Sequence, residues 1–486
     1  MKKRVLLSAA STVLLVSVLA ACGSTAEQTP ETDNTVKESV TAQEETEKTD
    51  LYQQLRGLDF GGAEVPMLLR DEYVYEFISE KENGDLVNDA VFARARAVEE
   101  MLNVKLQYRS APGNVKQKVE FTGLYRNSIL AADDSYSLVA SAANYMLPLT
   151  AEGLFANLTE TENVHTDSPW YPKGYIDNMS IEGKLFLTAT SASVNLVENM
   201  CVLFFNKNLT EALGFEEPYA LVREGKWTLE KLEEMVQNCY QDLNGNSKAD
   251  TEDRIGYLTY SNMVNAQAYG MGLSYFDHDE TGMLHYKTSL TEHDINVYNR
   301  LRDFLNTAGE VYNYDNPKGT ALAAAEEMVV FWESGNTLFM PQVLSCAQQM
   351  RGTGFDYGIL PMPKYDEAQK TYMSYVLENV TVMGISPITD TARAGAVLEA
   401  LSIGGYEDIA PAYFDIALKD KYARDADTAE MLDIIRSSIV FKYPMMQGFV
   451  PLNVFSKTDP VSAYLEQAAQ TENTFNTLVE GWKSLE

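Results

Sequence analysis

The sequence predicts an α/β protein with two such units along the chain. In the first unit, short apolar runs alternate with segments of helical periodicity. In chain order these are an extended run at 65–77, a helical pattern at 86–102, a strand-like run at 104–108, a helical pattern at 115–130 and an apolar run at 136–140. The connections are long enough for parallel crossovers, so the pattern predicts a β-α-β-α-β arrangement.

A second α/β unit is expected to begin near Met200. Apolar runs at 184–190 and 200–205 are typical of strands. Behind Thr228, which is a favourable N-cap residue, apolar side chains recur at helical spacing up to Tyr240. The segment at 254–260 then has the pattern of a further strand.

The composition is that of an ordinary globular protein. Of the 486 residues, 45% are hydrophobic and 22% are charged, a length and balance that suit two large lobes. A formal net charge of −32 argues against broad nucleic-acid binding. With four cysteines the chain has no disulfide framework, and Cys201, Cys239 and Cys346 are interpreted as small buried hydrophobes.

Residues 1–21 have the layout of a signal peptide. Positive charges in Met1 to Arg4 precede an apolar run of 16 residues, which is shorter than the about 20 residues that a membrane-spanning helix needs. Leu19-Ala20-Ala21-Cys22 resembles the bacterial lipobox, so Cys22 is expected to be lipidated; an ordinary secretory signal is the alternative. Residues 22–50 are expected to form an acidic, disordered tether, because 23–50 holds eight acidic and two basic residues and no aromatic residue.

Three separated passages resemble the extracellular solute-binding proteins of ABC importers, in the group that includes the maltodextrin receptors. The first is Gly183-Lys184-Leu185-Phe186 followed by Val202-Leu203-Phe204-Phe205-Asn206-Lys207-Asn208-Leu209. The second is Gly225-Lys226-Trp227-Thr228-Leu229-Glu230-Lys231-Leu232. The third is Gly335-Asn336-Thr337-Leu338-Phe339-Met340 followed by Tyr357-Gly358-Ile359-Leu360-Pro361-Met362-Pro363.

This resemblance implies an α/β, two-lobe periplasmic-binding-protein-like (type II) fold with strands that cross between the lobes. It places 60–195 with 380–410 in an N-terminal lobe and 200–375 with 411–486 in a C-terminal lobe. It also implies a non-enzymatic monomer that captures a small solute, expected to be a saccharide, and delivers it to an ABC permease. The lipid anchor would hold it on the outer face of the bacterial cytoplasmic membrane or in the periplasm.

A loop at 242–253 has the oxygen spacing of a calcium site. Oxygen-bearing side chains fall at loop positions 1, 3, 5, 9 and 12, with a backbone carbonyl at 7, which is spacing that wraps a chain around Ca²⁺. The expected structural Ca²⁺ ligands are Asp242, Asn244, Asn246, Lys248 through its carbonyl, Asp250 and Asp253. The alternative is a hydrated turn that needs no ion, since such residues favour turns.

Residues for the ligand are sought among aromatic and amide side chains beside the proposed crossings. Sugar rings offer apolar faces to aromatic platforms and hydroxyls to amides and carboxylates. The candidates are Tyr145, Trp170, Tyr171, Glu198, Asn199, Gln342, Glu378 and Asn379, with stacking expected on Trp170 or Tyr171. For each aromatic candidate, packing in the core is the alternative; Trp227 and Trp332 are expected to pack.

Two other functions stay open at this point. A secreted carbohydrate-active enzyme would need two acids brought about 5–9 Å apart by the fold. A calcium-dependent adhesion or scaffold module would need a second copy of the 242–253 loop, which the sequence does not contain.

Overall fold

The computed structural model describes residues 50–181, 183–247, 250, 252–278, 284–307, 310–313, 321–414, 426–441 and 454–485, the side chains of 321–326 and Ser456 excepted. The predicted signal peptide, Cys22, the tether up to residue 49 and Lys248 lie outside these residues. Among the helices described, none combines the length and the apolar character needed to cross a bilayer.

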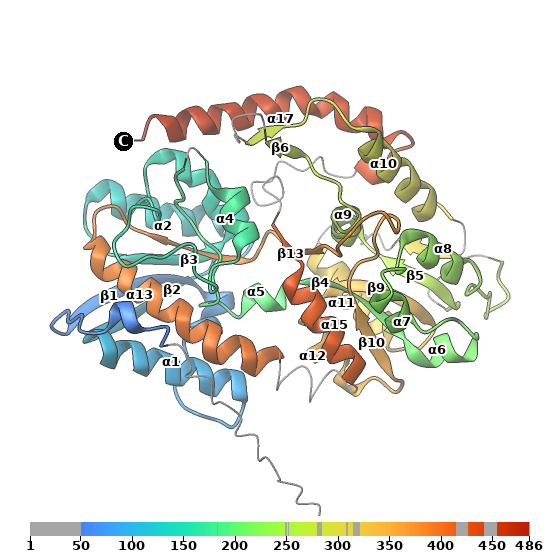
Figure 1. Ribbon diagram of the computed structural model, residues 1–486, viewed down its shortest axis with the longest axis horizontal. Helices are drawn as coiled ribbons and strands as arrows, with labels where there is room; N and C mark the ends of the chain where they lie inside the picture. The colour runs from blue at the N-terminus through green and yellow to red at the C-terminus, as the bar shows by residue number, and fades with distance from the viewer. Residues whose placement is uncertain are drawn as a thin grey trace, which may run out of the picture. The chain divides into compact units, whose positions relative to one another are not determined.

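The first lobe is built on a four-stranded sheet in the order β12-β3-β1-β2 (Figure 1, left). Strands β1 (Ala63–Arg70), β2 (Val104–Ala111) and β3 (Leu138–Ala142) run parallel, whereas β12 (Thr381–Ile385) returns antiparallel beside β3. The predicted β-α-β-α-β arrangement is therefore confirmed. The carboxyl ends of three parallel strands lie at one edge, which is where ligands bind in open α/β sheets.

Helices pack against the strands of this sheet and against one another. α1 (Leu86–Leu102) starts at Asp85, whose carboxylate accepts hydrogen bonds from the backbone N–H groups of Val87 and Asn88, and it packs against α13 (Thr391–Gly404). The other helices of this lobe are α2 (Lys118–Ala131), α3 (Ala143–Met146), η3 (Leu147–Glu152) and α4 (Lys173–Met179).

The second lobe has a five-stranded sheet in the order β10-β4-β9-β5-β8 (Figure 1, right). Its strands are β4 (Cys201–Asn206), β5 (Ile255–Thr259), β8 (Val311–Asn313), β9 (Thr337–Val343) and β10 (Tyr357–Leu360). Its helices are α6 (Lys207–Ala212), α7 (Pro218–Arg223), α8 (Leu229–Gln237), α9 (Ser261–Gly270), α10 (Glu292–Leu305), α11 (Ala321–Trp332), α12 (Cys346–Gln349), η4 (Met350–Gly352) and α15 (Ala426–Ser437). Thr228 caps α8 as expected, accepting from the Lys231 N–H at 3.4 Å.

Among the segments that join the lobes, two pair with each other. The first contains a four-residue helix, α5 (Asn195–Glu198), so the expected crossing strand at this place is wrong. The second runs through residues 375–381, and its Val376 forms an isolated antiparallel bridge with Met200. The Leu377 N–H donates to the Asn199 carbonyl at 3.1 Å, which fixes the register of the two segments.

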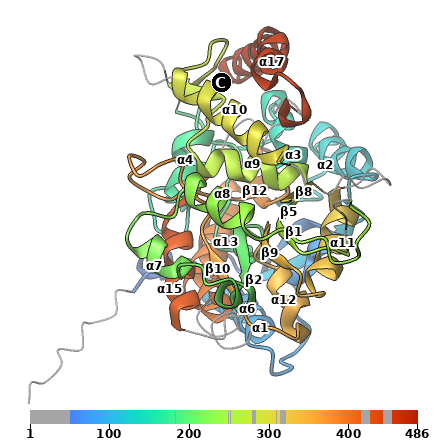
Figure 2. The ribbon, with the colours of Figure 1, turned by 90° about the vertical axis from the view of Figure 1, so that its right-hand side faces the viewer.

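Small elements complete the described chain. They are η1 (Gln53–Leu55), the hairpin of β6 (Phe276–His278) and β7 (Leu284–Tyr286), the pair β11 (Ser374–Tyr375) and β13 (Ile439–Val440), the π-helical turn η5 (Gly405–Ile409) and η7 (Val454–Ser456). The last helix, α17 (Pro460–Lys483), lies beside α10 in both views (Figures 1 and 2). Its final turns contact η3 of the first lobe, which differs from the expected placement of all of 411–486 in the second lobe.

Two strand predictions fail locally. Strand β1 ends at Arg70, and residues 71–76 form a 3-10 turn, η2 (Asp71–Glu76), in place of a continued strand. The segment 184–190 makes only the isolated bridges Ile181 to Lys184 and Thr188 to Met383 among the residues described. Trp227, Trp332 and the three cysteines are buried, as expected.

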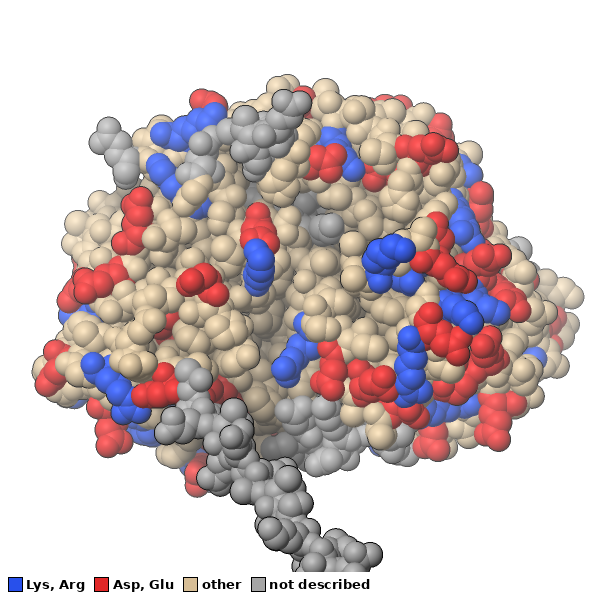
Figure 3. All heavy atoms as spheres, in the orientation of Figure 1, with Lys and Arg blue, Asp and Glu red and all other residues tan. Residues whose placement is uncertain are grey.

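Charged side chains gather on the second lobe over α6, α7 and α8, where acidic and basic groups alternate (Figure 3, right). Arg223 pairs with Asp427 and Glu430, and Lys231 pairs with Glu216 and Glu234. These are exposed pairs, so screening by solvent leaves each of them little net effect on the stability of the fold. Because Arg223 and Lys231 are paired with acidic side chains, they do not form a basic face for nucleic acid.

Candidate functional site

A cavity of about 550 Å³ lies where the first lobe, the crossing segment and the second lobe meet. The first lobe contributes Tyr73 and Tyr75 from η2 and Asp85, Val87 and Asn88 from the start of α1. The size falls within the roughly 300–1,000 Å³ of small-molecule sites. The cavity is also placed as expected for an α/β fold, because η2 directly follows the carboxyl end of β1.

Two tyrosines of η2 form the aromatic part of the wall. The Arg70 guanidinium lies over the Tyr73 ring, 4.1 Å from its centroid, and so covers one face of that ring. The Tyr73 and Tyr75 rings are 6.1 Å apart and inclined by 35°. Tyr75 keeps 46% of its surface exposed, an unusual amount for a large aromatic side chain at a cavity wall.

Glu198 fixes the orientation of this exposed ring. The Tyr75 hydroxyl donates to Glu198 Oε2 at 2.6 Å, across from η2 to the end of α5. Burial raises the pKa of Glu198, and the hydrogen bond from Tyr75 opposes that shift. The Tyr75 side chain is therefore held in the cavity wall by a hydrogen bond at its hydroxyl.

A buried polar network lies beneath the two tyrosines. The carboxyl group of Glu76 accepts hydrogen bonds from Ser193 Oγ and, at 2.9 Å, from Thr381 Oγ1, and these residues belong to the two different crossing segments. Arg70 Nη2 donates to Thr381 Oγ1 at 3.2 Å, and Arg94 Nη2 donates to the Glu76 carbonyl at 2.9 Å. Burial raises the pKa of Glu76 to about 7, although the nearby Arg70 charge lowers it.

Amide side chains supply much of the remaining wall. Asn195 Oδ1 accepts from Asn199 Nδ2 at 2.6 Å and from the Thr381 N–H at 3.0 Å, so both amides are fixed within the crossing. From the second lobe come Ser345, Gln348, Gln349 and Arg351, of which the two glutamines are exposed. Tyr413, which follows η5, closes the cavity from a third direction.

The eight predicted ligand residues fall into three groups. Glu198 and Asn199 line the cavity. A second group, Tyr145, Gln342, Glu378 and Asn379, gathers beside the crossing segments outside the cavity. The charges of Arg70 and Glu378 act on the Tyr145 hydroxyl, and the Asn144 N–H donates to the Glu378 carbonyl at 3.1 Å.

The polar atoms of this second group are enclosed and incompletely bonded. Gln342 Oε1 accepts from the Tyr260 hydroxyl at 3.3 Å, but Gln342 Nε2, Glu378 Oε2 and Asn379 Oδ1 have no hydrogen-bond partner among the residues described. Burial raises the pKa of Glu378. An unpaired buried polar atom costs about 1–3 kcal/mol. These three atoms could therefore form further hydrogen bonds, with water or with another polar group.

Trp170 and Tyr171 form the third group, and they lie in the core of the first lobe rather than in the cavity. Both are buried, the Tyr171 hydroxyl donates to Glu399 Oε2 at 2.6 Å, and Trp170 packs edge-on against Tyr406. His165 Nδ1 meets the other oxygen of Glu399 at 2.9 Å. The expected stacking of a ligand on these two rings gives way to the alternative of core packing.

Sequence reasoning missed Tyr73, Tyr75, Gln348 and Tyr413. Tyr73 and Tyr75 carried a usable signal, because residues that follow the carboxyl end of a first parallel strand are favoured binding positions. Treating 65–77 as one continuous strand concealed that signal. Gln348 lies within α12 and Tyr413 follows η5, and the sequence shows nothing that marks either as a cavity residue.

The predicted calcium loop is closed by its own hydrogen bonds. Asp242 accepts from the N–H groups of Gly245 and Ser247 at 2.6 and 2.8 Å, and buried Asp253 accepts from the Leu243 N–H at 3.0 Å. Asn244 Nδ2 and Asn246 Nδ2 donate to Asp250 at 3.1 and 2.7 Å. Within the described part of the chain, no three acidic, histidine or cysteine side chains converge as metal ligands.

No protein-family model and no curated relative matches the sequence. Solved structures do share the fold. A sugar transporter protein from Rhizobium etli in an open conformation has 11% identity and a TM-score of 0.57, covering 87% of this chain and 100% of that chain. An ABC substrate-binding protein from Listeria monocytogenes in complex with cycloalternan has 13% identity and a TM-score of 0.54, covering 85% and 99%.

A cyclic alpha-maltosyl-1,6-maltose binding protein from Arthrobacter globiformis is similar at 12% identity and a TM-score of 0.53, covering 87% of this chain and 99% of that chain. These likenesses span nearly the whole length of the solved proteins. They confirm the predicted α/β, two-lobe fold of solute-binding proteins.

The buried carboxyl group of Glu76 makes a prediction about stability and pH. Its pKa is about 7 in the folded protein and ordinarily 4.5, so the folded state holds a proton that the unfolded state releases between these pH values. The contribution of this carboxyl group to the free energy of unfolding should therefore be greatest below pH 4.5. It should fall by about 3 kcal/mol as the pH rises from 4.5 to 7. Glu76→Gln, which stays neutral, should lose this component.

Urea unfolding at pH 5 and pH 8 measures the difference for each protein. Glu120→Gln, at an exposed position on α2, is the matched control and should keep the wild-type pH dependence. An identical fall in stability for wild type and Glu76→Gln would show that the carboxyl group titrates no differently in the two states.

Proposed function

We propose that this protein is an extracellular solute-binding protein that captures a saccharide and delivers it to an ABC permease. The observation that carries the proposal is the oriented, exposed Tyr75 ring in a cavity whose other walls are rich in amides. An aromatic face suits the C–H face of a sugar ring, and amides and carboxylates pair with its hydroxyls. Two solved proteins of this fold support the saccharide class: one is in complex with cycloalternan, and the other is named as a cyclic alpha-maltosyl-1,6-maltose binding protein.

The proposed role is binding without chemistry. Of the two acids in the cavity wall, Asp85 caps α1 and Glu198 holds the Tyr75 hydroxyl, so each already has a structural task. Lobe closure by hinge motion at the crossing segments would enclose the solute. The protein would act as a monomer.

Tyr75→Ala tests the site directly. It should weaken binding of the best saccharide from a thermal-shift panel that includes maltose, maltotetraose, raffinose and xylobiose. A loss of at least about tenfold is expected, because ~1.4 kcal/mol of stacking and apolar contact corresponds to that factor. Tyr75→Phe keeps the ring and loses only the bond to Glu198, so its affinity should fall between the two.

Tyr406→Ala serves as the control, since Tyr406 is also exposed, at 36%, and does not line the cavity. Calorimetry gives the affinities, and mass spectrometry of the released ligand should recover it intact. Wild-type affinity in Tyr75→Ala would remove this cavity as the binding site, and cleaved saccharide would place the protein among enzymes.

We also propose that the 242–253 loop binds one structural Ca²⁺. The loop holds two carboxylates and two amides close together: Asp242 accepts from the Gly245 N–H, and Asn244 and Asn246 donate to Asp250. Oxygen donors of these kinds suit Ca²⁺. Rotation of the two amides would turn their oxygens toward Asp250, and the buried Asp253 would hold the base of the loop.

Chelator should then lower the melting temperature of the wild type, because an ion that binds the folded state stabilises it by mass action. Asp242→Ala should melt at one temperature with and without chelator, whereas Asp167→Ala, at an exposed position remote in sequence, should respond like the wild type. A wild type whose melting ignores both chelator and added Ca²⁺ would leave a hydrogen-bonded turn that needs no ion.

Finally, we propose that Cys22 becomes the lipidated N-terminus and anchors the protein to the membrane. The leader and the lipobox-like sequence before Cys22 support this. Mass spectrometry of the membrane fraction should find a diacylated N-terminal cysteine, and Cys22→Ser should release the protein from the membrane. A mature N-terminus at another residue would overturn the anchor.

A further inference from the structure

One rigid helix is anchored to both lobes. α17 has 24 residues and is therefore about 36 Å long at 1.5 Å per residue. Asp459 caps its start, accepting from the Ser462 N–H at 3.0 Å, and Pro460 occupies the first helical position. In Figure 1 the helix runs from above the second lobe to above the first.

The first half of α17 is bound to the second lobe by aromatic rings. The Tyr464 ring stacks on Tyr275 and Tyr286, with centroids 5.6 and 6.0 Å apart. Its hydroxyl donates to the Lys287 carbonyl at 2.6 Å. Further along the helix, Phe475 meets Phe276 edge-on at 4.7 Å.

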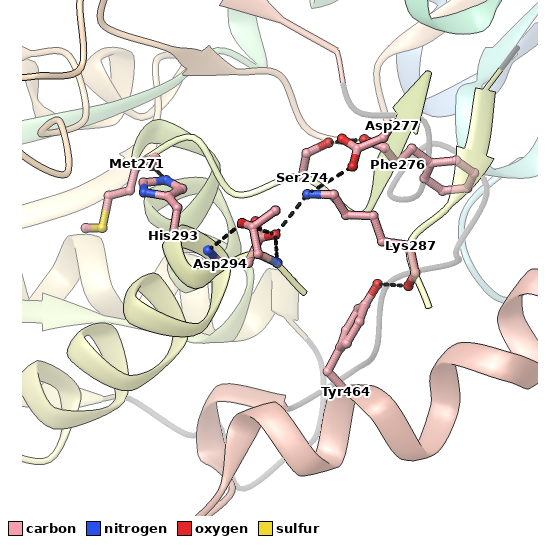
Figure 4. A network of polar contacts seen from close by, with 9 residues as sticks. Met271, Ser274, Phe276, Asp277, Lys287, His293, Asp294 and Tyr464 are labelled. Atoms are coloured by element: carbon pink, nitrogen blue, oxygen red, sulfur yellow. Dashed lines mark hydrogen bonds and ion pairs between the residues drawn. The ribbon is translucent and has the colours of Figure 1, made fainter. Parts of the chain in front are cut away.

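A buried ion pair holds the residue to which Tyr464 is bonded (Figure 4). Lys287 Nζ lies 2.9 Å from Asp294 Oδ2, and both side chains are buried. Asp294 belongs to the capping box of α10, so this contact joins the β6–β7 hairpin to the start of that helix. The anchor of α17 on the second lobe is therefore part of the core of that lobe.

The last turn of α17 is bound to the first lobe. Trp482 is only 1% exposed, packs edge-on against Phe186 at 5.0 Å and donates from Nε1 to Thr150 Oγ1 at 2.8 Å. Lys184 Nζ donates to the carbonyl groups of Trp482 and Leu485. Gly481 lies so close to η3 that an added Cβ atom would stand 2.8 Å from Ala151 Cβ.

Between the two anchors the helix does not pack closely on the first lobe. A groove of about 540 Å³ separates η3, at Pro148 and Ala151, from Asn473, Thr474 and Leu478 of α17. Attachment to the first lobe is thus concentrated in the final turns. Tyr464 and Trp482 are 18 residues apart, which is about 27 Å along the helix axis.

We propose that α17 is a strap that limits how far the two lobes can separate. A helix does not lengthen without breaking its backbone hydrogen bonds, so the lobes can move apart beyond the span between the two anchors only if one anchor is released. Trp482 is the anchor that releases first, because a few terminal contacts hold it, whereas the second-lobe anchor is continuous with a core. This inference concerns the ligand-free protein and stands independently of the proposed saccharide.

The test measures the distance between the lobes without ligand. Spin labels are attached at Glu100→Cys on α1 and Glu211→Cys on α6, two exposed positions, in a full chain that carries Cys22→Ser. The native Cys201, Cys239 and Cys346 are buried and do not compete for the label. Double electron–electron resonance then gives the distance distribution for the wild-type strap and for its variants.

Two variants weaken the first-lobe anchor in different ways. Trp482→Ala removes the ring, and Gly481→Ala favours the helix while pushing its last turn away from Ala151. Leu465→Ala, at an exposed position of the same helix, is the matched control. Hydrogen exchange of residues 460–475 verifies in each variant that the second-lobe anchor stays folded.

The expected result is a broader distribution with a longer mean distance in Trp482→Ala and in Gly481→Ala, and a wild-type distribution in Leu465→Ala. If Trp482→Ala does not fold, Gly481→Ala decides the question. Wild-type distances in the folded anchor variants, or equal broadening in Leu465→Ala, would overturn the strap.

Discussion

The carboxyl group of Glu76 connects three parts of the chain that must keep their places for the lobes to stay aligned. It accepts from Ser193 in one crossing segment and from Thr381 in the other, and it sits on the same turn as Tyr73 and Tyr75. In a low-dielectric interior such hydrogen bonds are strong, and their loss leaves a buried polar group unpaired. The geometry of the cavity wall therefore depends on Glu76, Ser193 and Thr381, which do not themselves line the cavity.

The crossing segment that contains α5 is also hydrogen-bonded to the part of the second lobe that lines the cavity. The Ser345 N–H donates to the Glu198 carbonyl at 3.1 Å, and the Leu344 N–H donates to the Met200 carbonyl at 2.9 Å. Glu198 in turn orients Tyr75. A rotation of the lobes about these segments would thus move the aromatic platform and the amide wall relative to each other, which couples closure to the shape of the cavity.

Tyrosine serves two purposes in this protein. In the second lobe Tyr275 and Tyr286 stack on Tyr464, and Tyr298 lies against the same ring at a tilt of 41°; these buried rings contribute a large apolar area. Burial raises the pKa of each of these four hydroxyls. Tyr75 differs from them because its ring is exposed and its hydroxyl is bonded to a carboxylate. A high tyrosine content therefore does not by itself mark a binding site, because rings such as these four are buried in the core.

The sequence by itself determined the α/β class, the parallel order of the first three strands and the start of α8 at Thr228, because these follow from periodicity and capping within short segments. It also singled out Glu198 and Asn199, which the structure places in the cavity wall; their role in binding stays a prediction. Only the tertiary structure decided that Tyr171 bonds to Glu399, that Trp170 packs against Tyr406 and that Tyr75 lines the cavity. The surroundings of an aromatic side chain depend on which distant segments lie against it, here α13 for the buried Tyr171 and α5 for the exposed Tyr75, and no local pattern records those partners.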